Sequence, residues 1–198
     1  MQQAIRVREY HLPLHKAGED HPLININLLV ASPLRRGLNT AEHIFGDDFS
    51  FPGTPRLALP LAAERLYFSS DIGRYRHTLE ESHPSWDFSL IEHGKTWWFD
   101  IDGNNGPEGE NQSVVPPHLD WRPHPELAQF ACAGEPEHKF RERMMALKEW
   151  LQNRPEKNIV VVTHWGVIRA LTGQSVDNCA VVEVLSDDLL DDMVIDDT

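Results

Sequence analysis

Short apolar runs alternate with amphipathic stretches along this chain. The runs over 26–31 and 158–163 are mostly apolar, which is typical of strands buried on both faces of a parallel sheet. Each run leads into a segment where apolar residues recur at helical spacing, and Gly46 and Gly173 follow as helix stops. This order of strand and helix predicts a layered α/β fold with a mainly parallel sheet.

Local signals predict further boundaries. Ser32 and Pro33 are expected to be the N-cap and first residue of the first helix. The other expected elements are a weak strand at 57–59, a short helix at 74–82, a long helix at 135–153 with Phe140, Met144, Leu147 and Leu151 on one face, and a final strand at 179–184. Residues 101–136 are rich in Gly, Pro and Asn, so we expect a long loop or lid there.

The length and composition predict one globular domain. The 198 residues are 40% hydrophobic and contain no internal repeat, so we expect a single domain over 1–185 with a lid or insert at about 85–135. Six aspartates after Ser186 predict a solvated acidic tail over 186–198. The formal charge of −13 disfavours nucleic acid as a partner, and an anionic substrate would need a local basic pocket.

The cysteines and the apolar runs bear on the cellular location of the protein. Cys132 and Cys179 are the two cysteines, too few for a disulfide framework and too far apart for a Cys-x-x-Cys motif. No apolar run reaches the roughly 20 residues of a membrane span, and the first residues lack the apolar core of a signal peptide. We therefore expect a cytoplasmic protein with no membrane partner.

Cationic side chains follow both main strands. His164 comes directly after the second apolar run, and Arg35 and Arg36 open the helix after the first. Ligands bind at the carboxyl ends of parallel strands, and arginine binds phosphate through its planar fork. Adjacent helical side chains diverge by roughly 100°, so one arginine is expected to face the site. The alternatives are a solvated arginine pair and a structural or metal-binding histidine.

A metal site is a competing hypothesis. The chain has eleven histidines, including His11, His15, His21, His118, His124 and His138. Zinc sites prefer tight spacing assisted by cysteine, which this sequence lacks. We therefore expect no metal and no cofactor.

Two motifs resemble one family. Ser-Pro-Leu-Arg-Arg-Gly-Leu-Asn-Thr-Ala at 32–41 and Val-Val-Thr-His-Trp-Gly at 161–166 are similar to motifs of the histidine phosphatase superfamily, the phosphoglycerate mutase-like proteins. Between them, 63–67 and 70–73 are similar to the segment with the family's acidic residue. The resemblance extends over about 12–185 and implies a three-layer α/β sandwich with a mainly parallel central sheet.

The resemblance also implies roles for three residues. Arg36 would clamp the phosphoryl group, Glu64 would donate a proton to the leaving oxygen, and His164 would hydrogen-bond the phosphoryl oxygens. In the family, these groups surround a nucleophilic histidine that forms a phosphohistidine, which water then hydrolyses. The implied partner is a phosphorylated small molecule or a phosphoprotein. The choice of mutase or phosphatase, the natural substrate and the oligomeric state stay open.

The nucleophile motif of the family, Arg-His-Gly, does not occur in this sequence. His11 is a poor substitute, since it lacks the flanking residues and lies too close to Ser32. Residues 12–21 resemble a family segment downstream of the motif, so the first strand is expected to be missing, or replaced by 4–8. We favour an N-terminally incomplete, inactive form of an active phosphatase. The alternative is a pseudoenzyme that binds a phosphate or a phosphoprotein.

Aromatic residues could shape the pocket. Trp165 stands where the family often has glycine and is expected to narrow the pocket mouth. Residues 87–91 and the Trp97–Trp98 pair fall where family members carry substrate-selecting insertions. Simple lid packing is the alternative for both segments.

Overall fold

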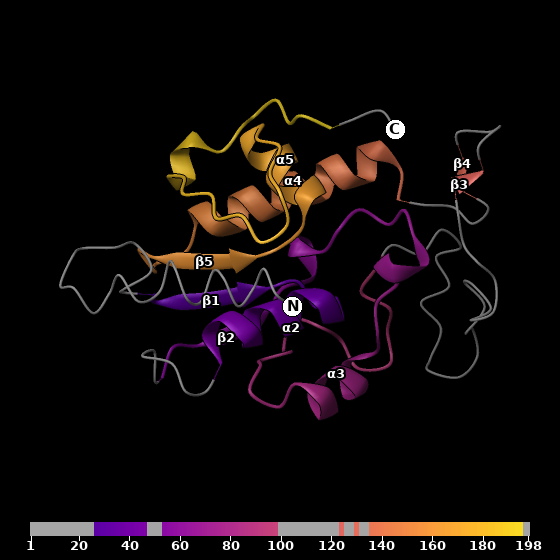
Figure 1. The fold of residues 1–198 in the computed structure, drawn as a ribbon, viewed down its shortest axis with the longest axis vertical. Coiled ribbons are helices and arrows are strands. Elements are labelled where there is room, and N and C mark those ends of the chain that lie inside the picture. Colours follow the sequence, from indigo (N-terminus) through magenta and orange to yellow (C-terminus); the bar gives the residue numbers. More distant parts are fainter. Residues whose placement is uncertain (1–25, 47–52, 99–122, 125–128, 131–134, 196–198) are drawn as a thin grey trace.

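The fold was analysed in a computed structural model of the chain (Figure 1). The described residues are 26–46, 53–98, 123–124, 129–130 and 135–195. The strand expected at 4–8 and most of the loop expected at 101–136 lie outside these residues.

Three parallel strands form the main sheet. They are β1 (Leu28–Ala31), β2 (Arg56–Ala58) and β5 (Ile159–Val162), in the order β2-β1-β5. β1 lies in the centre and is buried along its whole length, as its apolar sequence requires. All three carboxyl ends therefore meet at one edge of the sheet. The mainly parallel sheet expected from the sequence is confirmed.

Helices cover both faces of this sheet, which makes three layers (Figure 1). The described helices are α2 (Arg35–Phe45), α3 (Arg76–Ser82), α4 (Glu137–Gln152) and α5 (Trp165–Thr172). Side chains alternate along β1: Leu29 and Ala31 pack in a cluster with residues of α2 and α3, whereas Leu28 and Val30 pack with residues of α4 and α5. The sandwich expected from the family resemblance is confirmed.

The expected start of the first helix is wrong by two residues. α2 begins at Arg35, and Leu34 occupies the N-cap position with an extended backbone (φ −63°, ψ 131°). The hydroxyl of Ser32 accepts a hydrogen bond from the N–H of Leu34 at 3.3 Å, but it also bonds His164. Ser32 therefore lies at the edge of the sheet, where it contacts His164, and it is not the N-cap of the helix. The stop at Gly173 is confirmed, because this residue ends α5 with φ 71°.

The final strand expected at 179–184 is wrong. Residues 180–185 have no regular structure, and Val181 and Val184 are exposed. Within the described part of the chain no strand lies beside them, and a strand forms only where a partner satisfies its backbone groups. The expected loop over 101–136 also contains one short antiparallel pair, β3 (Pro123–His124) and β4 (Gln129–Phe130).

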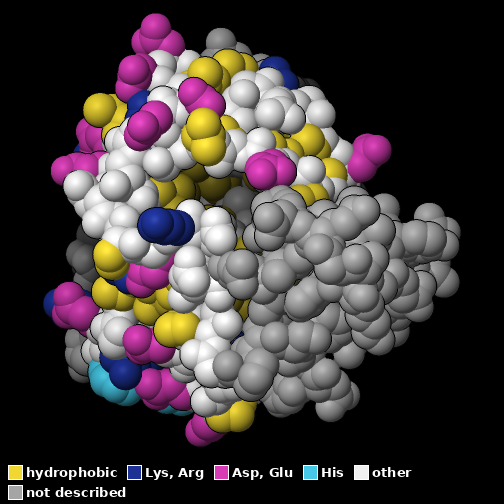
Figure 2. All heavy atoms as spheres, turned by 90° about the vertical axis from the view of Figure 1, so that its left-hand side faces the viewer, with side chains coloured by type: hydrophobic (Ala, Val, Ile, Leu, Met, Phe, Trp, Pro, Cys, Tyr) yellow, Lys and Arg dark blue, Asp and Glu magenta, His cyan; other side chains and the backbone are white. Residues whose placement is uncertain are grey.

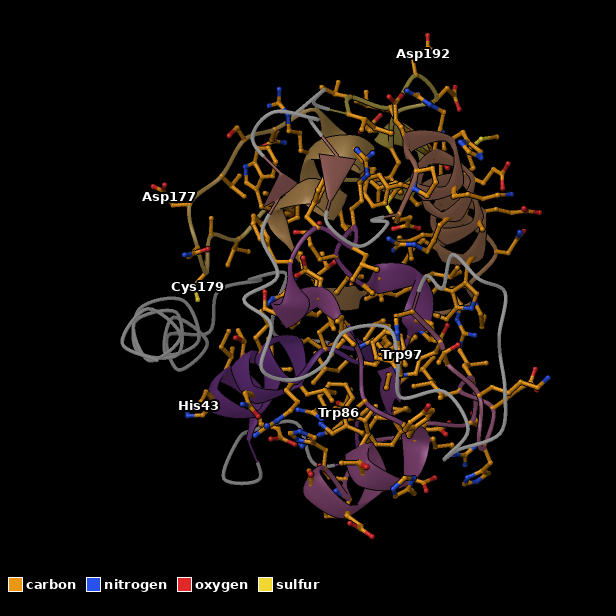
Figure 3. The ribbon with its side chains drawn as sticks, turned by 90° about the vertical axis from the view of Figure 1, so that its right-hand side faces the viewer. His43, Trp86, Trp97, Asp177, Cys179 and Asp192 are labelled. Carbon is orange, nitrogen blue, oxygen red and sulfur yellow. The ribbon has the colours of Figure 1, made fainter. Side chains whose placement is uncertain are left out.

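The acidic tail is solvated only in part. Asp192 points outward at the periphery of the molecule (Figure 3), as the aspartate-rich composition predicts. Leu189 and Met193 are buried, however, in the cluster that contains α4 and α5. The tail therefore belongs to the packed domain at these two residues.

None of the helices in the described ranges has the length and apolar character needed to cross a membrane.

Candidate functional site

Two strand ends place a serine beside a histidine. Ala31 of β1 pairs with Val162 of β5, so the residues that follow both strands lie at the same edge. The Oγ of Ser32 is 2.7 Å from the Nε2 of His164, and both side chains are buried. This contact joins residues that are 132 positions apart in the sequence.

Arg36 reaches this pair from the first turn of α2. Its Nε donates to the Nδ1 of His164 at 3.3 Å. Its Nη1 donates to the carbonyl of Ser70 at 2.6 Å, and its Nη2 donates to the Oδ1 of Asp71 at 2.6 Å. The side chain is 41% exposed, so the guanidinium lies at the surface of the site. Its neighbour Arg35 is exposed.

Asp71 is a site residue that the sequence analysis did not single out. Its side chain is 4% exposed, and it forms an ion pair with Arg36. Its Oδ2 accepts hydrogen bonds from the N–H groups of Tyr67 and Phe68, at 3.1 and 2.8 Å. Asp71 therefore fixes the orientation of the guanidinium. It lies in the 70–73 segment of the family resemblance, which was the available signal.

The carboxylate of Glu64 lies at the start of α5. Its Oε2 accepts a hydrogen bond from the N–H of Gly166 at 3.3 Å, and its Oε1 accepts one from the N–H of Arg65 at 2.9 Å. A Cβ at position 166 would come too close to this carboxylate, so a larger residue there would force the Glu64 side chain to move. Burial raises the pKa of Glu64, and the two backbone hydrogen bonds oppose that rise.

Arg143 of α4 holds the segment that carries Glu64. Its Nη1 donates to the carbonyls of Leu61 and Ala63 at 2.9 and 2.7 Å, and its Nη2 donates to the carbonyl of Glu64 at 3.3 Å. It also pairs with both carboxylate oxygens of Glu135, at 2.9 and 2.6 Å. The sequence analysis missed this residue, because nothing in the helical pattern distinguishes it from a solvated arginine.

The imidazole of His164 is held uncharged. Burial lowers its pKa to about 3, and the positive charges of Arg36 and Arg143 act in the same direction. At neutral pH the ring therefore offers one N–H donor and one acceptor nitrogen.

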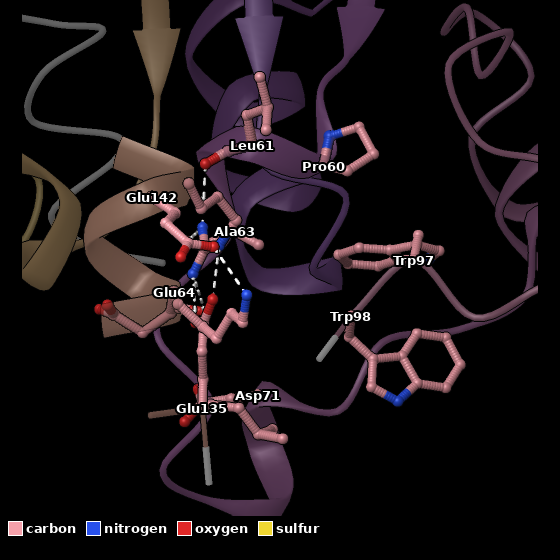
Figure 4. A pocket seen from close by; sticks show the side chains of 12 residues that line it. Pro60, Leu61, Ala63, Glu64, Asp71, Trp97, Trp98, Glu135 and Glu142 are labelled. Atoms are coloured by element: carbon pink, nitrogen blue, oxygen red, sulfur yellow. Dashed lines mark hydrogen bonds and ion pairs between the residues drawn. The ribbon is translucent and has the colours of Figure 1, made fainter. Parts of the chain in front are cut away.

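A pocket of about 420 Å³ lies beside Glu64 and Asp71 (Figure 4). It is lined by Pro60, Leu61, Ala63, Glu64, Leu66, Asp71, Trp97, Trp98, Glu135, Lys139, Glu142 and Arg143. Trp97 and Trp98 therefore contribute to a cavity wall. By contrast, Phe88 and Ile91 are buried in the core, which supports packing as the role of segment 87–91.

The structure brings the three expected site residues to one edge of the sheet. Arg36 contacts His164 directly, and Glu64 bonds the backbone two residues after His164. Trp165, expected at the pocket mouth, is 42% exposed and does not line the pocket beside Glu64; its Nε1 donates to Ser175.

Within the described ranges, no three histidine, cysteine or carboxylate side chains gather as a metal site. Five of the six histidines considered for such a site have side chains outside the described part, so that hypothesis is tested only at His138, which is exposed.

A comparison with protein-family models matches residues 54–180 to the histidine phosphatase superfamily, branch 1. The chain belongs to the histidine phosphatase superfamily. The matched region of this histidine phosphatase-like chain includes Glu64 and His164, and Arg36 lies ahead of it. Searches of curated proteins and of solved structures gave no significant match.

Proposed function

We propose that this edge of the sheet binds the phosphoryl group of a phosphomonoester. The observation that supports the proposal is the direct contact of Arg36 with His164 at two strand ends, with the Glu64 carboxylate beside them. Arg36 supplies the positive charge, and an arginine fork suits phosphate oxygens. Its hydrogen bonds to described residues use three of its five N–H groups, and we propose that an oxyanion accepts from the other two.

Glu64 is proposed as the proton donor to the leaving oxygen. A carboxyl group can act as an acid near neutral pH only if its pKa lies above the ordinary value, and burial shifts Glu64 in this direction. His164 stays uncharged, and its Nε2–H would exchange its contact with Ser32 for a phosphoryl oxygen, because its Nδ1 already accepts from Arg36. Together these groups would bind the ester and stabilise charge on the departing alcohol.

The attacking group is the part of the chemistry that this sequence does not supply. The family forms a phosphohistidine at an Arg-His-Gly motif, and that motif does not occur in the 198 residues. We therefore propose that the chain binds a phosphomonoester without turnover. A pocket of about 420 Å³ beside Glu64 has room for the leaving group of a small-molecule ester. A cytoplasmic location stays a prediction from the cysteine pattern.

The test is a thermal-shift titration with inorganic phosphate, together with an assay of phosphomonoester hydrolysis at mildly acidic pH. Arg36→Ala should abolish the phosphate-dependent shift, because it removes the cation of the site. Arg35→Ala is the matched control, since it removes the neighbouring exposed charge, and its shift should equal that of the unmodified chain.

Two results would contradict this proposal. An equal loss of the phosphate-dependent thermal shift in both arginine variants would mean that phosphate binds through the overall surface charge and not at a site formed by Arg36. Turnover that survives His11→Ala and disappears in His164→Ala would contradict binding without turnover and would show that the site has a nucleophile this proposal does not assign.

A further inference from the structure

We propose that the pocket beside Glu64 holds the leaving group of the ester, and that it selects phosphomonoesters whose leaving group carries no negative charge. The proposal rests on the proposed binding of phosphate at Arg36. It adds a substrate class to that site.

The position of the pocket connects it to the phosphoryl site. Glu64 and Asp71 both line the pocket, and Asp71 is the ion-pair partner of Arg36. A phosphoryl group at Arg36 with its leaving oxygen at Glu64 would direct the alcohol into this pocket. Figure 4 shows Trp97 and Pro60 on one side of the pocket, and Glu64 and Glu142 on the other.

The charges of the lining set the selectivity. Four carboxylates and two cations line the pocket. Arg143 pairs with Glu135 at 2.6 Å, and Lys139 pairs with Glu142 at 2.8 Å. A leaving group with its own carboxylate or phosphate would compete with Glu135 or Glu142 for these two cations, and Asp71 is a further carboxylate of the lining. The carboxylates of the lining repel a negative charge placed beside them, so an anionic leaving group is disfavoured.

The rest of the lining is apolar and aromatic. Pro60, Leu61 and Leu66 contribute aliphatic surface. The rings of Trp97 and Trp98 lie 5.7 Å apart and nearly perpendicular, with an interplanar angle of 88°. Such walls bind uncharged organic groups by removing their apolar surface from water. A phenyl ring is small enough for a pocket of about 420 Å³.

The experiment compares two esters that differ in one charge, phenyl phosphate and 4-carboxyphenyl phosphate. Binding of each to the 198-residue chain is measured by isothermal titration calorimetry, with inorganic phosphate as the reference. We expect phenyl phosphate to bind at least about tenfold more tightly than its carboxylated analogue.

A charge variant tests the origin of the preference. Glu142→Gln removes a carboxylate from the lining and frees Lys139, so the preference should fall to about threefold or less. Glu92→Gln is the matched control, because Glu92 also pairs with a lysine three residues away, Lys95, but does not line the pocket. This variant should keep the full preference. Circular dichroism confirms that both variants are folded.

The outcomes separate the two proposals. Equal binding of both esters would overturn the selectivity. Binding of inorganic phosphate but of neither ester would show that the pocket takes no leaving group. Failure of all three ligands, phosphate included, would instead overturn the proposed function on which the pocket depends. An unchanged preference in Glu142→Gln would also contradict the charge argument.

Discussion

The imidazole of His164 links the chemistry of the site to the stability of the chain. It is buried between the hydroxyl of Ser32 and the guanidinium of Arg36, and both contacts suit an uncharged ring. Burial lowers the pKa of His164 to about 3 in the folded chain. On acidification, the unfolded chain therefore takes up a proton at His164 at a higher pH than the folded chain does. The free energy of unfolding therefore decreases as the pH falls below 6.5, the ordinary pKa of histidine.

The first prediction concerns this pH dependence. Between about pH 6.5 and pH 3, the unfolded chain binds a proton at position 164 that the folded chain does not bind. The free energy of unfolding should therefore fall by about 1.4 kcal/mol per pH unit below about pH 6.5, or by about 2 kcal/mol at pH 5. Urea unfolding at pH 7.5 and pH 5 measures this loss.

Two variants separate His164 from its neighbour. Burial raises the pKa of Glu64, so its contribution has the opposite sign: the folded chain holds that proton more tightly, and stability from this group decreases as the pH rises. His164→Gln should remove much of the acid-induced loss, whereas Glu64→Gln should make the loss steeper. An unchanged pH dependence in His164→Gln would contradict the assignment.

The second prediction concerns Gly166. A methyl group at this position would meet the carboxylate of Glu64, so Gly166→Ala should reduce stability by about 1–3 kcal/mol. Glu64→Ala removes the obstacle. The double variant should therefore be more stable than the sum of the two single effects predicts, as measured by urea unfolding of all four proteins. Simple additivity would show that the collision does not occur.

At the scale of the elements, one side chain connects α4 to the acid of the site. Arg143 donates to three carbonyls in the segment 61–64, and it pairs with Glu135, whose side chain is 5% exposed. The position of Glu64 therefore depends on how α4 packs against the sheet.

The third prediction follows from this connection. Arg143→Met should reduce the free energy of unfolding by about 3–5 kcal/mol, because it leaves the buried carboxylate of Glu135 without its partner. Arg141→Met is the control in the same helix. Arg141 pairs with Glu137, with both side chains about 40% exposed, and donates to the carbonyl of Met193 at 3.3 Å, so its loss should cost about 1–2 kcal/mol. Equal effects would mean that Arg143 is an ordinary surface cation.

Local patterns predicted the elements that have strong local causes. β5, α4 and α5 follow from an apolar run, an apolar helical face and a stop at Gly173. The strand expected at 179–184 failed because a strand needs a partner, and pairing is not a local property. Asp71 and Arg143 were missed for a similar reason, since their partners are far away in the sequence.

At the scale of the whole molecule, the sheet separates two apolar clusters, and the C-terminal segment completes one of them. Leu189 and Met193 pack beside residues of α4 and α5. Figure 2 shows acidic side chains scattered over the described part of one face, with fewer lysines and arginines among them. Arg36 is a cation at the site in a chain with a net charge of −13, and it is paired with Asp71.

The fourth prediction concerns this closing segment. Leu189→Ala should reduce the free energy of unfolding by about 2–5 kcal/mol, because it opens a cavity in the cluster. Leu185→Ala, four residues earlier, changes a side chain that is 72% exposed and should cost less than about 0.5 kcal/mol. Thermal or urea unfolding distinguishes the two. Similar small effects would place the segment outside the cooperative unit.

The ion pair between Arg36 and Asp71 has a consequence for the choice of anion. The guanidinium carries a counter-ion of its own, so an arriving anion enters by competition with a carboxylate that is already bonded. A singly charged anion such as chloride or acetate carries no more charge than the Asp71 carboxylate with which it competes. Doubly ionised phosphate offers more, and it has several oxygens to share among the donors. Because Asp71 competes for the guanidinium, singly charged anions should bind weakly at this site, whereas doubly ionised phosphate should bind.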